Sequence, residues 1–231
     1  MVICSVCNTK NDEYATICTK CGGFLQNRVA NLDLFDTLWR TIENPRKAFR
    51  MIALAEHKNY ALFLYVLSGI SITFFGFWYF RLGERFESVP STIVWALLIG
   101  VPLGAVLCLV VSFFHWILSR AAGGKSTFRI SMGVTSYSLM PIIVSLVLLL
   151  PIELMTFGMY IFTFNPHPYA VKPLSYVVLI GLNVLLIIWT FLLAIIGTKT
   201  AGQINTFKSI LIAALLYMIV IGGFLYCGTY L

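Results

Sequence analysis

AAGGKSTFRIS at residues 121–131 and TAGQINTFKSI at residues 200–210 are two short polar stretches that decide the fold. They resemble each other when they are aligned 79 positions apart. The matched pairs are Ala122-Gly123 with Ala201-Gly202, Thr127-Phe128 with Thr206-Phe207, and Arg129 with Lys208. Each stretch is preceded and followed by an apolar run long enough to cross a bilayer. The repeated unit is therefore predicted to be a span, a basic turn and a second span.

The composition around these turns is typical of an integral membrane protein. Of the 231 residues, 59% are hydrophobic and 11% are charged, against about 25% charged residues in soluble domains. Five uncharged runs of 21 to 27 residues follow Asn59, and a helical span needs about 20. The predicted spans are 60–80, 92–118, 131–152, 176–198 and 209–230. Because these runs are continuous rather than alternating, we expect an all-α fold of five transmembrane helices with a parallel internal repeat.

The basic residues are distributed unequally between the two sides of this arrangement. Of the 16 Lys and Arg residues, all but Arg81, Arg85 and Lys172 fall on the side of the N-terminus and the two echoed turns. The positive-inside bias then predicts a cytoplasmic N-terminus and an external C-terminus in the cell membrane. The net charge of +7 is explained by this topology, so we expect the lipid bilayer and no nucleic acid as a partner.

Four cysteines near the N-terminus are arranged as Cys4-x2-Cys7, a spacer of ten residues, and Cys18-x2-Cys21. Two such turns let four thiolates converge on one tetrahedral Zn²⁺, and the closed ligand shell leaves no position for catalysis. Residues 1–24 are therefore predicted to form a small structural zinc ribbon whose folding depends on the metal. Two disulfides or a rubredoxin-type iron site are the alternatives, and the reducing cytoplasmic side disfavours the disulfides.

Residues 25–58 are predicted to be a short linker followed by two amphipathic juxtamembrane helices. Apolar residues recur at helical spacing in each, and Asn44-Pro45 is a helix start between them. The apolar sets are Leu32, Phe35, Leu38, Trp39 and Ile42 in the first, and Ala48, Phe49, Ile52 and Ala53 in the second. These helices either lie in the inner membrane interface or pack on the cytoplasmic ends of the spans. The membrane domain itself is predicted to cover residues 59–231.

A few polar residues and prolines interrupt the apolar runs. His115 is expected to be hydrogen-bonded or interfacial rather than a ligand, and Glu153 is expected near the outer surface, next to Pro151. Pro141 and Pro151 are predicted to interrupt the third span. The uncharged continuation after Glu153 is long enough for a short re-entrant or interfacial segment.

The order of these motifs resembles the Yip family, named for its interaction with Ypt/Rab GTPases, and in particular its bacterial branch. The resemblance rests on Asn44-Pro45-Arg46-Lys47-Ala48-Phe49, on GGKSTF at residues 123–128, and on Tyr137 and Pro141. It covers roughly residues 34–231. It implies five spans, a cytoplasmic N-terminus and a non-enzymatic membrane partner, which for bacterial members includes ABC transporters.

Two functions fit these features, and a third, an enzyme, does not. The first is a scaffold or assembly factor in which the ribbon and the echoed turns bind another membrane protein or complex, with Phe128, Arg129, Phe207 and Lys208 as partner-binding residues. The second is a permease or channel component, because parallel repeats and broken helices occur in transporters. An enzyme is not expected, because the sequence lacks His-Glu-x-x-His, Gly-x-Ser-x-Gly and a phosphate-binding loop. A second copy of the chain is a further candidate partner.

Overall fold

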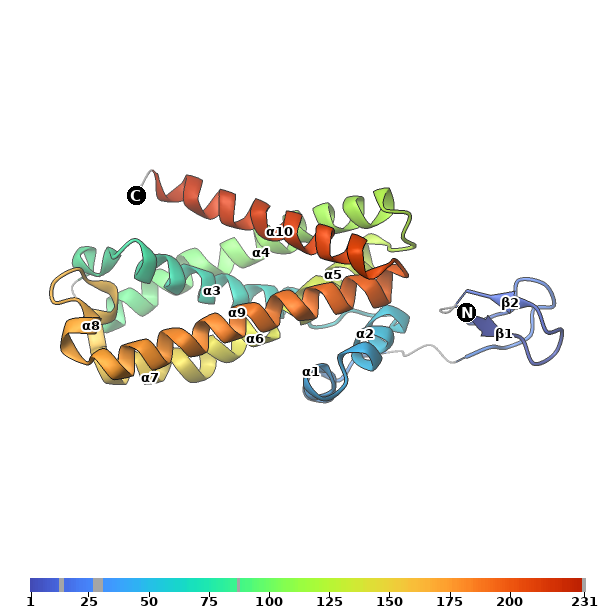
Figure 1. The fold of residues 1–231 in the computed structure, drawn as a ribbon, viewed down its shortest axis with the longest axis horizontal. Coiled ribbons are helices and arrows are strands. Elements are labelled where there is room, and N and C mark those ends of the chain that lie inside the picture. The colour runs from blue at the N-terminus through green and yellow to red at the C-terminus, as the bar shows by residue number, and fades with distance from the viewer. Residues whose placement is uncertain (13–14, 27–30, 87, 230–231) are drawn as a thin grey trace.

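A helical bundle with a small N-terminal β-ribbon is seen in the computed structural model, which describes residues 1–12, 15–26, 31–86 and 88–229 (Figure 1). Five helices are long and apolar enough to cross a membrane, as the sequence predicts. The two echoed turns, at residues 122–127 and 203–205, lie at the same end of the bundle, near the ribbon (Figure 1). The N-terminal elements are β1 (Val2–Ile3), β2 (Lys10–Asn11), α1 (Leu34–Glu43) and α2 (Pro45–Leu54).

Four of the five predicted spans coincide with single long helices. These are α3 (Ala61–Tyr79), α4 (Val89–Ala121), α9 (Pro173–Gly202) and α10 (Thr206–Gly228). Helix α4 continues through Pro102, where the missing N–H makes a kink expected. The last predicted position of the fifth span, residue 230, lies outside the described residues, as do residues 27–30 of the predicted linker.

The third span differs from its prediction in both position and continuity. The candidate span covers Met140–Phe162 rather than 131–152, and residues before it form a separate buried helix, α5 (Phe128–Ser138). The span consists of α6 (Met140–Val144), the π-helical turn η2 (Ser145–Leu149), α7 (Leu150–Phe157) and η3 (Gly158–Phe162). Pro141 and Pro151 lack the N–H that continues a helix, so the breaks fall where the sequence predicts.

The polar residues of α5 explain why hydropathy misplaced this span. Ser136 and Ser138 donate their hydroxyls to Gly133 O and Val134 O, at 3.0 and 2.7 Å. Tyr65 of α3 donates to Thr135 Oγ1 at 2.6 Å. Helix α5 is therefore covered by protein rather than by lipid, and the hydroxyl groups of Thr135, Ser136 and Ser138 are hydrogen-bonded within the bundle.

The segment after Glu153 continues the third span and does not form a re-entrant hairpin of its own. Beyond η3, a four-residue helix, α8 (Pro168–Val171), leads into α9. Arg81, which follows α3 and precedes η1 (Leu82–Arg85), joins these pieces. Its guanidinium donates to Ile161 O at 3.0 Å and lies 2.9 Å from His167 Nε2. This network closes the end of the bundle opposite the ribbon.

Helices α3 and α4 approach each other closely because glycines lie at their contact. A Cβ added to Gly69 would lie 2.4 Å from both Gly100 O and Gly104 N, which no side chain could occupy without moving a backbone. Small residues that allow two helices to approach closely are typical of packing in lipid, where no hydrophobic effect drives the helices together. The α3–α4 pair is therefore the rigid centre of the membrane domain.

We expect Gly69→Ala to lower the free energy of unfolding by about 1–3 kcal/mol or more, since overpacking must displace the α4 backbone. Gly222→Ala is the matched control, because a Cβ there meets nothing within 4 Å. Thermal unfolding of both variants in detergent measures the difference. Equal midpoints for the two variants would contradict the close packing of α3 on α4.

Helix α2 takes the second of the two predicted locations, on the ends of the spans. Asn44 caps α2 by accepting from Lys47 N at 3.3 Å, and Ala48, Phe49 and Ile52 are fully buried against the bundle. A Cβ on Gly197 of α9 would lie within 3.0 Å of the Phe49 ring, so α2 is seated directly on α9. Helix α2 thus packs on the span ends rather than lying free in the interface.

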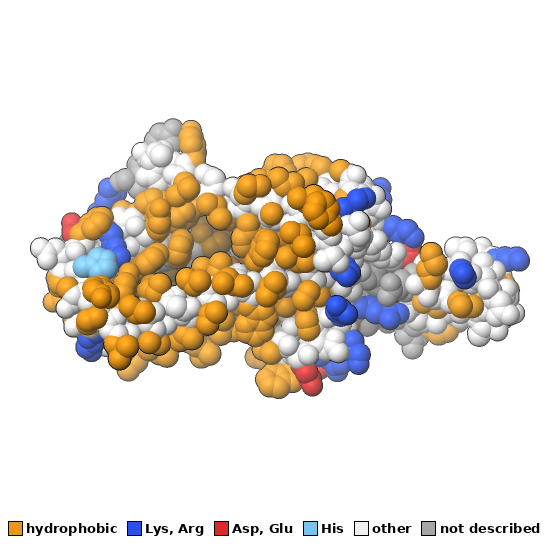
Figure 2. Space-filling model, in the orientation of Figure 1, with side chains coloured by type: hydrophobic (Ala, Val, Ile, Leu, Met, Phe, Trp, Pro, Cys, Tyr) orange, Lys and Arg blue, Asp and Glu red, His pale blue; other side chains and the backbone are white. Residues whose placement is uncertain are grey.

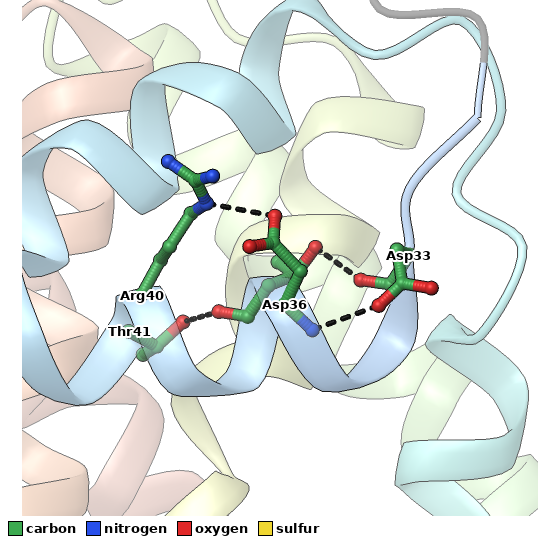
Figure 3. A network of polar contacts seen from close by, with 5 residues as sticks. Asp33, Asp36, Arg40 and Thr41 are labelled. Carbon is green, nitrogen blue, oxygen red and sulfur yellow. Dashed lines mark hydrogen bonds and ion pairs between the residues drawn. The ribbon is translucent and has the colours of Figure 1, made fainter.

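Helix α1 has its own network of polar contacts at its N-terminus and along one side (Figure 3). Asp33 accepts from Asp36 N at 2.8 Å, and Asp36 pairs with Arg40 at 2.7 Å. Phe35 and Trp39 are 80% and 66% exposed. An amphipathic helix with exposed aromatic residues beside a span suits the membrane interface.

Candidate functional site

Two superimposable knuckles make up the N-terminal ribbon. In the first, Cys4 N donates to Thr9 O and Asn8 N donates to Cys4 O, both at 3.0 Å. In the second, Cys18 N donates to Gly23 O at 2.8 Å and Gly22 N donates to Cys18 O at 3.0 Å. Asn8 and Gly22, each following the second cysteine of its pair, have φ of 52° and 69°. Glycine and asparagine adopt this left-handed backbone most readily, so both knuckles turn in the same way.

These turns bring all four sulfur atoms to one point. The Sγ atoms lie within 4.8 Å of one another, and the Cys4–Cys21 and Cys7–Cys18 pairs are 3.6 Å apart. A tetrahedral zinc with Zn–S bonds of about 2.3 Å needs sulfur separations of about 3.8 Å. The four cysteines could therefore hold a metal ion, and four thiolates are a set that Zn²⁺ prefers.

Hydrogen bonds to the sulfurs complete the site. The backbone N–H groups of Cys21 and Lys20 lower the pKa of Cys18 to about 6. Although the Gly23 N–H lowers the pKa of Cys21, the neighbouring Cys7 and Cys4 thiols raise it to about 12. Deprotonation of a second thiol is unfavourable because two thiolates this close repel each other. A bound cation would offset this repulsion.

Asn11, in the spacer between the two cysteine pairs, is a supporting residue of the site. Its side chain is 5% exposed. Its amide donates to Cys18 Sγ at 3.4 Å and its Oδ1 accepts from Thr19 N at 3.0 Å. Such outer hydrogen bonds orient metal ligands. In the sequence, the only indication of this role was an Asn within the spacer between the two cysteine pairs.

The two echoed turns are in direct contact with each other. Lys125 N donates to Gly202 O at 3.1 Å, and Lys208 Nζ donates to Ala122 O at 2.7 Å. Ile204 is 8% exposed and packs with Leu118 of α4. The turns of the repeat therefore form one continuous surface, which we call the paired turns (residues 121–131 and 200–210).

The repeat within the paired turns is out of register by one residue at the helix starts. Thr127 caps α5 by accepting from Ile130 N at 3.3 Å, whereas Asn205, not Thr206, caps α10 by accepting from Lys208 N at 2.8 Å. Phe128 is half-buried, and Phe207 is 68% exposed. The two phenylalanines are therefore not equivalent, and Phe207 is the more accessible.

Asp12 links the ribbon to the paired turns, a contact that sequence reasoning missed. One carboxylate oxygen pairs with Lys125 Nζ of the first turn, and the other accepts from Gln203 Nε2 of the second at 2.5 Å. Basic side chains gather at this end of the bundle (Figure 2). The sequence indicates this contact only through the opposite charges of Asp12 in the ribbon and Lys125 in the first turn.

A model of the Yip1 domain matches residues 39–227. The chain belongs to the Yip1 domain family. Comparison with curated proteins finds no match, and comparison with solved structures finds none either.

The Yip1 match begins at Trp39 in α1 and ends at Cys227 in α10, so it contains both echoed turns and leaves the four ribbon cysteines outside. Within it, His115 is buried and its Nε2 lies 2.9 Å from Thr198 Oγ1, which joins α4 to α9. His115 is thus hydrogen-bonded between helices, as its sequence context predicts. The protein is a multi-pass membrane protein with five apolar helices of spanning length.

Proposed function

We propose that this Yip1-domain protein is a non-enzymatic scaffold for another membrane complex. The cytoplasmic zinc ribbon and the paired turns form the docking surface for that complex, and the spans hold this surface at the membrane. The observation that carries the proposal is the contact of Asp12 with Lys125 and Gln203, because it joins the metal module to both turns at once. An ABC transporter is the class of partner that the family resemblance suggests.

The contact between the ribbon and the paired turns must be weak if a partner is to displace the ribbon. Asp12 is 29% and Lys125 65% exposed on their side chains. Exposed ion pairs contribute less than about 1 kcal/mol, so the ribbon can leave the paired turns when a partner competes for either surface. Lys208 Nζ donates to Ala122 O, and Phe207 is the more exposed of the two phenylalanines among the four predicted partner-binding residues.

The proposal is tested by co-purification of native membrane partners with Phe207→Ala and Phe128→Ala. We expect Phe207→Ala to lower partner recovery several-fold while folded protein is unchanged, because its exposed ring contributes little to the fold. Phe128→Ala removes a half-buried ring, so we expect it to lower both the partner recovery and the amount of folded protein. Removing one interface aromatic residue typically costs about 2 kcal/mol or more when it is a hot spot.

Phe164→Ala is the matched control, because Phe164 is 65% exposed and lies in the connection at the opposite end of the bundle. Its recovery of partners should equal that of the unmodified protein. If Phe207→Ala and Phe164→Ala recover partners equally, the paired turns only anchor helix ends and the scaffold proposal must be given up for this surface.

A further inference from the structure

A cavity of about 530 Å³ lies inside the membrane domain, between α3, the third span, α9 and α10. Helices α9 and α10 leave a common turn and diverge toward the C-terminal end (Figure 1). The surface between their apolar ridges is hollowed on the face shown in Figure 2. Most of the lining is apolar, including Phe74, Leu146, Ile187 and Val220. The hollow therefore opens toward lipid rather than toward either aqueous side.

One carboxyl group interrupts this apolar lining. Glu153 of α7 is 9% exposed, and its Oε1 accepts from Asn183 Nδ2 of α9 at 2.6 Å. It lies nine positions before the end of the third span and is buried between helices, so the expected place at the outer surface is not where the structure puts it. Within the described part of the chain, Glu153 Oε2 has no hydrogen-bond partner.

The neighbouring groups hold this carboxyl in place without using its second oxygen. The Asn183 amide also donates to Leu179 O at 3.1 Å, and its Oδ1 accepts from Ser145 Oγ at 2.5 Å. Every hydrogen-bonding position of the Asn183 side chain except one lone pair is then occupied. Ser145 begins the π-helical turn η2, a feature that often marks functional sites in helices.

We propose that this cavity binds a single-chain amphiphile whose head group donates a hydrogen bond to Glu153 Oε2 and whose apolar chain lies along α9 toward Thr190. A carboxyl group within a span is costly unless it is paired, and none of the residues lining the cavity is basic. A donor or cation from the occupant supplies the missing pair. This ligand site is independent of the ribbon and the paired turns.

The size of the cavity suits a small ligand. Cavities that bind small ligands are about 300–1,000 Å³, and 530 Å³ falls within that range. One slender apolar chain therefore fits between α9 and α10.

The test uses two photoactivatable probes of equal chain length, a long-chain primary amine and the corresponding methyl ester, with the full-length protein in lipid nanodiscs. The amine donates a hydrogen bond and the ester can only accept one. We expect saturable crosslinking of the amine to residues of the cavity and labelling by the ester about tenfold weaker, the difference expected for one charge-assisted hydrogen bond. Equal labelling by both probes would overturn the proposal.

Glu153→Gln makes the test specific for the second oxygen. The glutamine carbonyl can still accept from Asn183, so the helix contact is retained, while an NH₂ group replaces Oε2. The preference should therefore reverse, with the ester labelling more strongly than the amine. An unchanged preference for the amine would overturn the role of Glu153, whatever the stability of the variant.

Ile187→Trp and Ile188→Trp form a matched pair on α9. Ile187 lines the cavity and is 40% exposed, and Ile188 is 50% exposed without lining it. Only Ile187→Trp should reduce saturable amine labelling, by about tenfold, at equal thermal stability. Equal labelling of the two variants would mean that the probe lies on the outer lipid-facing surface and not in the cavity.

Discussion

Purified protein is expected to contain about one zinc ion per chain, and replacing Cys4 and Cys21 by serine is expected to remove it. The four Sγ atoms lie within 4.8 Å of one another, which is the arrangement of a closed tetrahedral shell. The ribbon has two strands of two residues each and almost no core. Binding of structural zinc, worth about 10–16 kcal/mol, would then supply its folding free energy. Elemental analysis measures the metal, and protease resistance of residues 1–24 measures the fold.

Cys108→Ala with Cys227→Ala is the matched control, because it removes two cysteines outside the ribbon. This variant should keep its zinc and its protease resistance. Iron in place of zinc would show visible charge-transfer absorption, and two disulfides would block alkylation without any metal. Full zinc content in the Cys4→Ser, Cys21→Ser variant would exclude the four-cysteine site.

The number of spans follows from sequence because lipid demands long uncharged runs, and charges at Arg120 and Lys199 delimit them. The third span shows where this reasoning fails. Between Arg129 and Lys172 the only charged residue is Glu153, so hydropathy offers no charged residue that marks where the span begins. What decides the boundary is that Thr135, Ser136 and Ser138 of α5 are hydrogen-bonded within the bundle, Thr135 through the hydroxyl of Tyr65 in α3.

Side-chain contacts between residues far apart in the sequence could not be predicted, for a different reason. Asp12 and Gln203 are 191 positions apart, and Glu153 and Asn183 are 30 apart on different helices. Each residue alone is ordinary in its local sequence. Only the approach of α9 to α7, and of the ribbon to the turns, gives them partners. The clustering of the four cysteines was predictable because each Cys-x-x-Cys pair is contained in four consecutive residues.

Labelling of single cysteines in intact cells is expected to place the paired turns inside and the α8 connection outside. Thr206 and Ala170 are both exposed near the start of a helix, so cysteines there are equally accessible to a reagent in water. Ser126, the central position of the first turn, is 1% exposed and is unsuitable. In a background lacking Cys108 and Cys227, Ala170→Cys should react with an impermeant maleimide and Thr206→Cys should be protected.

The physical reason is the distribution of charge along the five helices. Basic side chains concentrate at the end of the bundle that carries the paired turns (Figure 2), and only Arg81, Arg85 and Lys172 lie at the other, so insertion is expected to leave the first end in the cytoplasm. Permeabilised cells provide the control, because Thr206→Cys must then react. The parent protein without an added cysteine measures the background from the ribbon thiols. Equal labelling of Ala170→Cys and Thr206→Cys in intact cells would place both ends of the bundle on one side, and strong labelling of Thr206→Cys alone would invert the orientation.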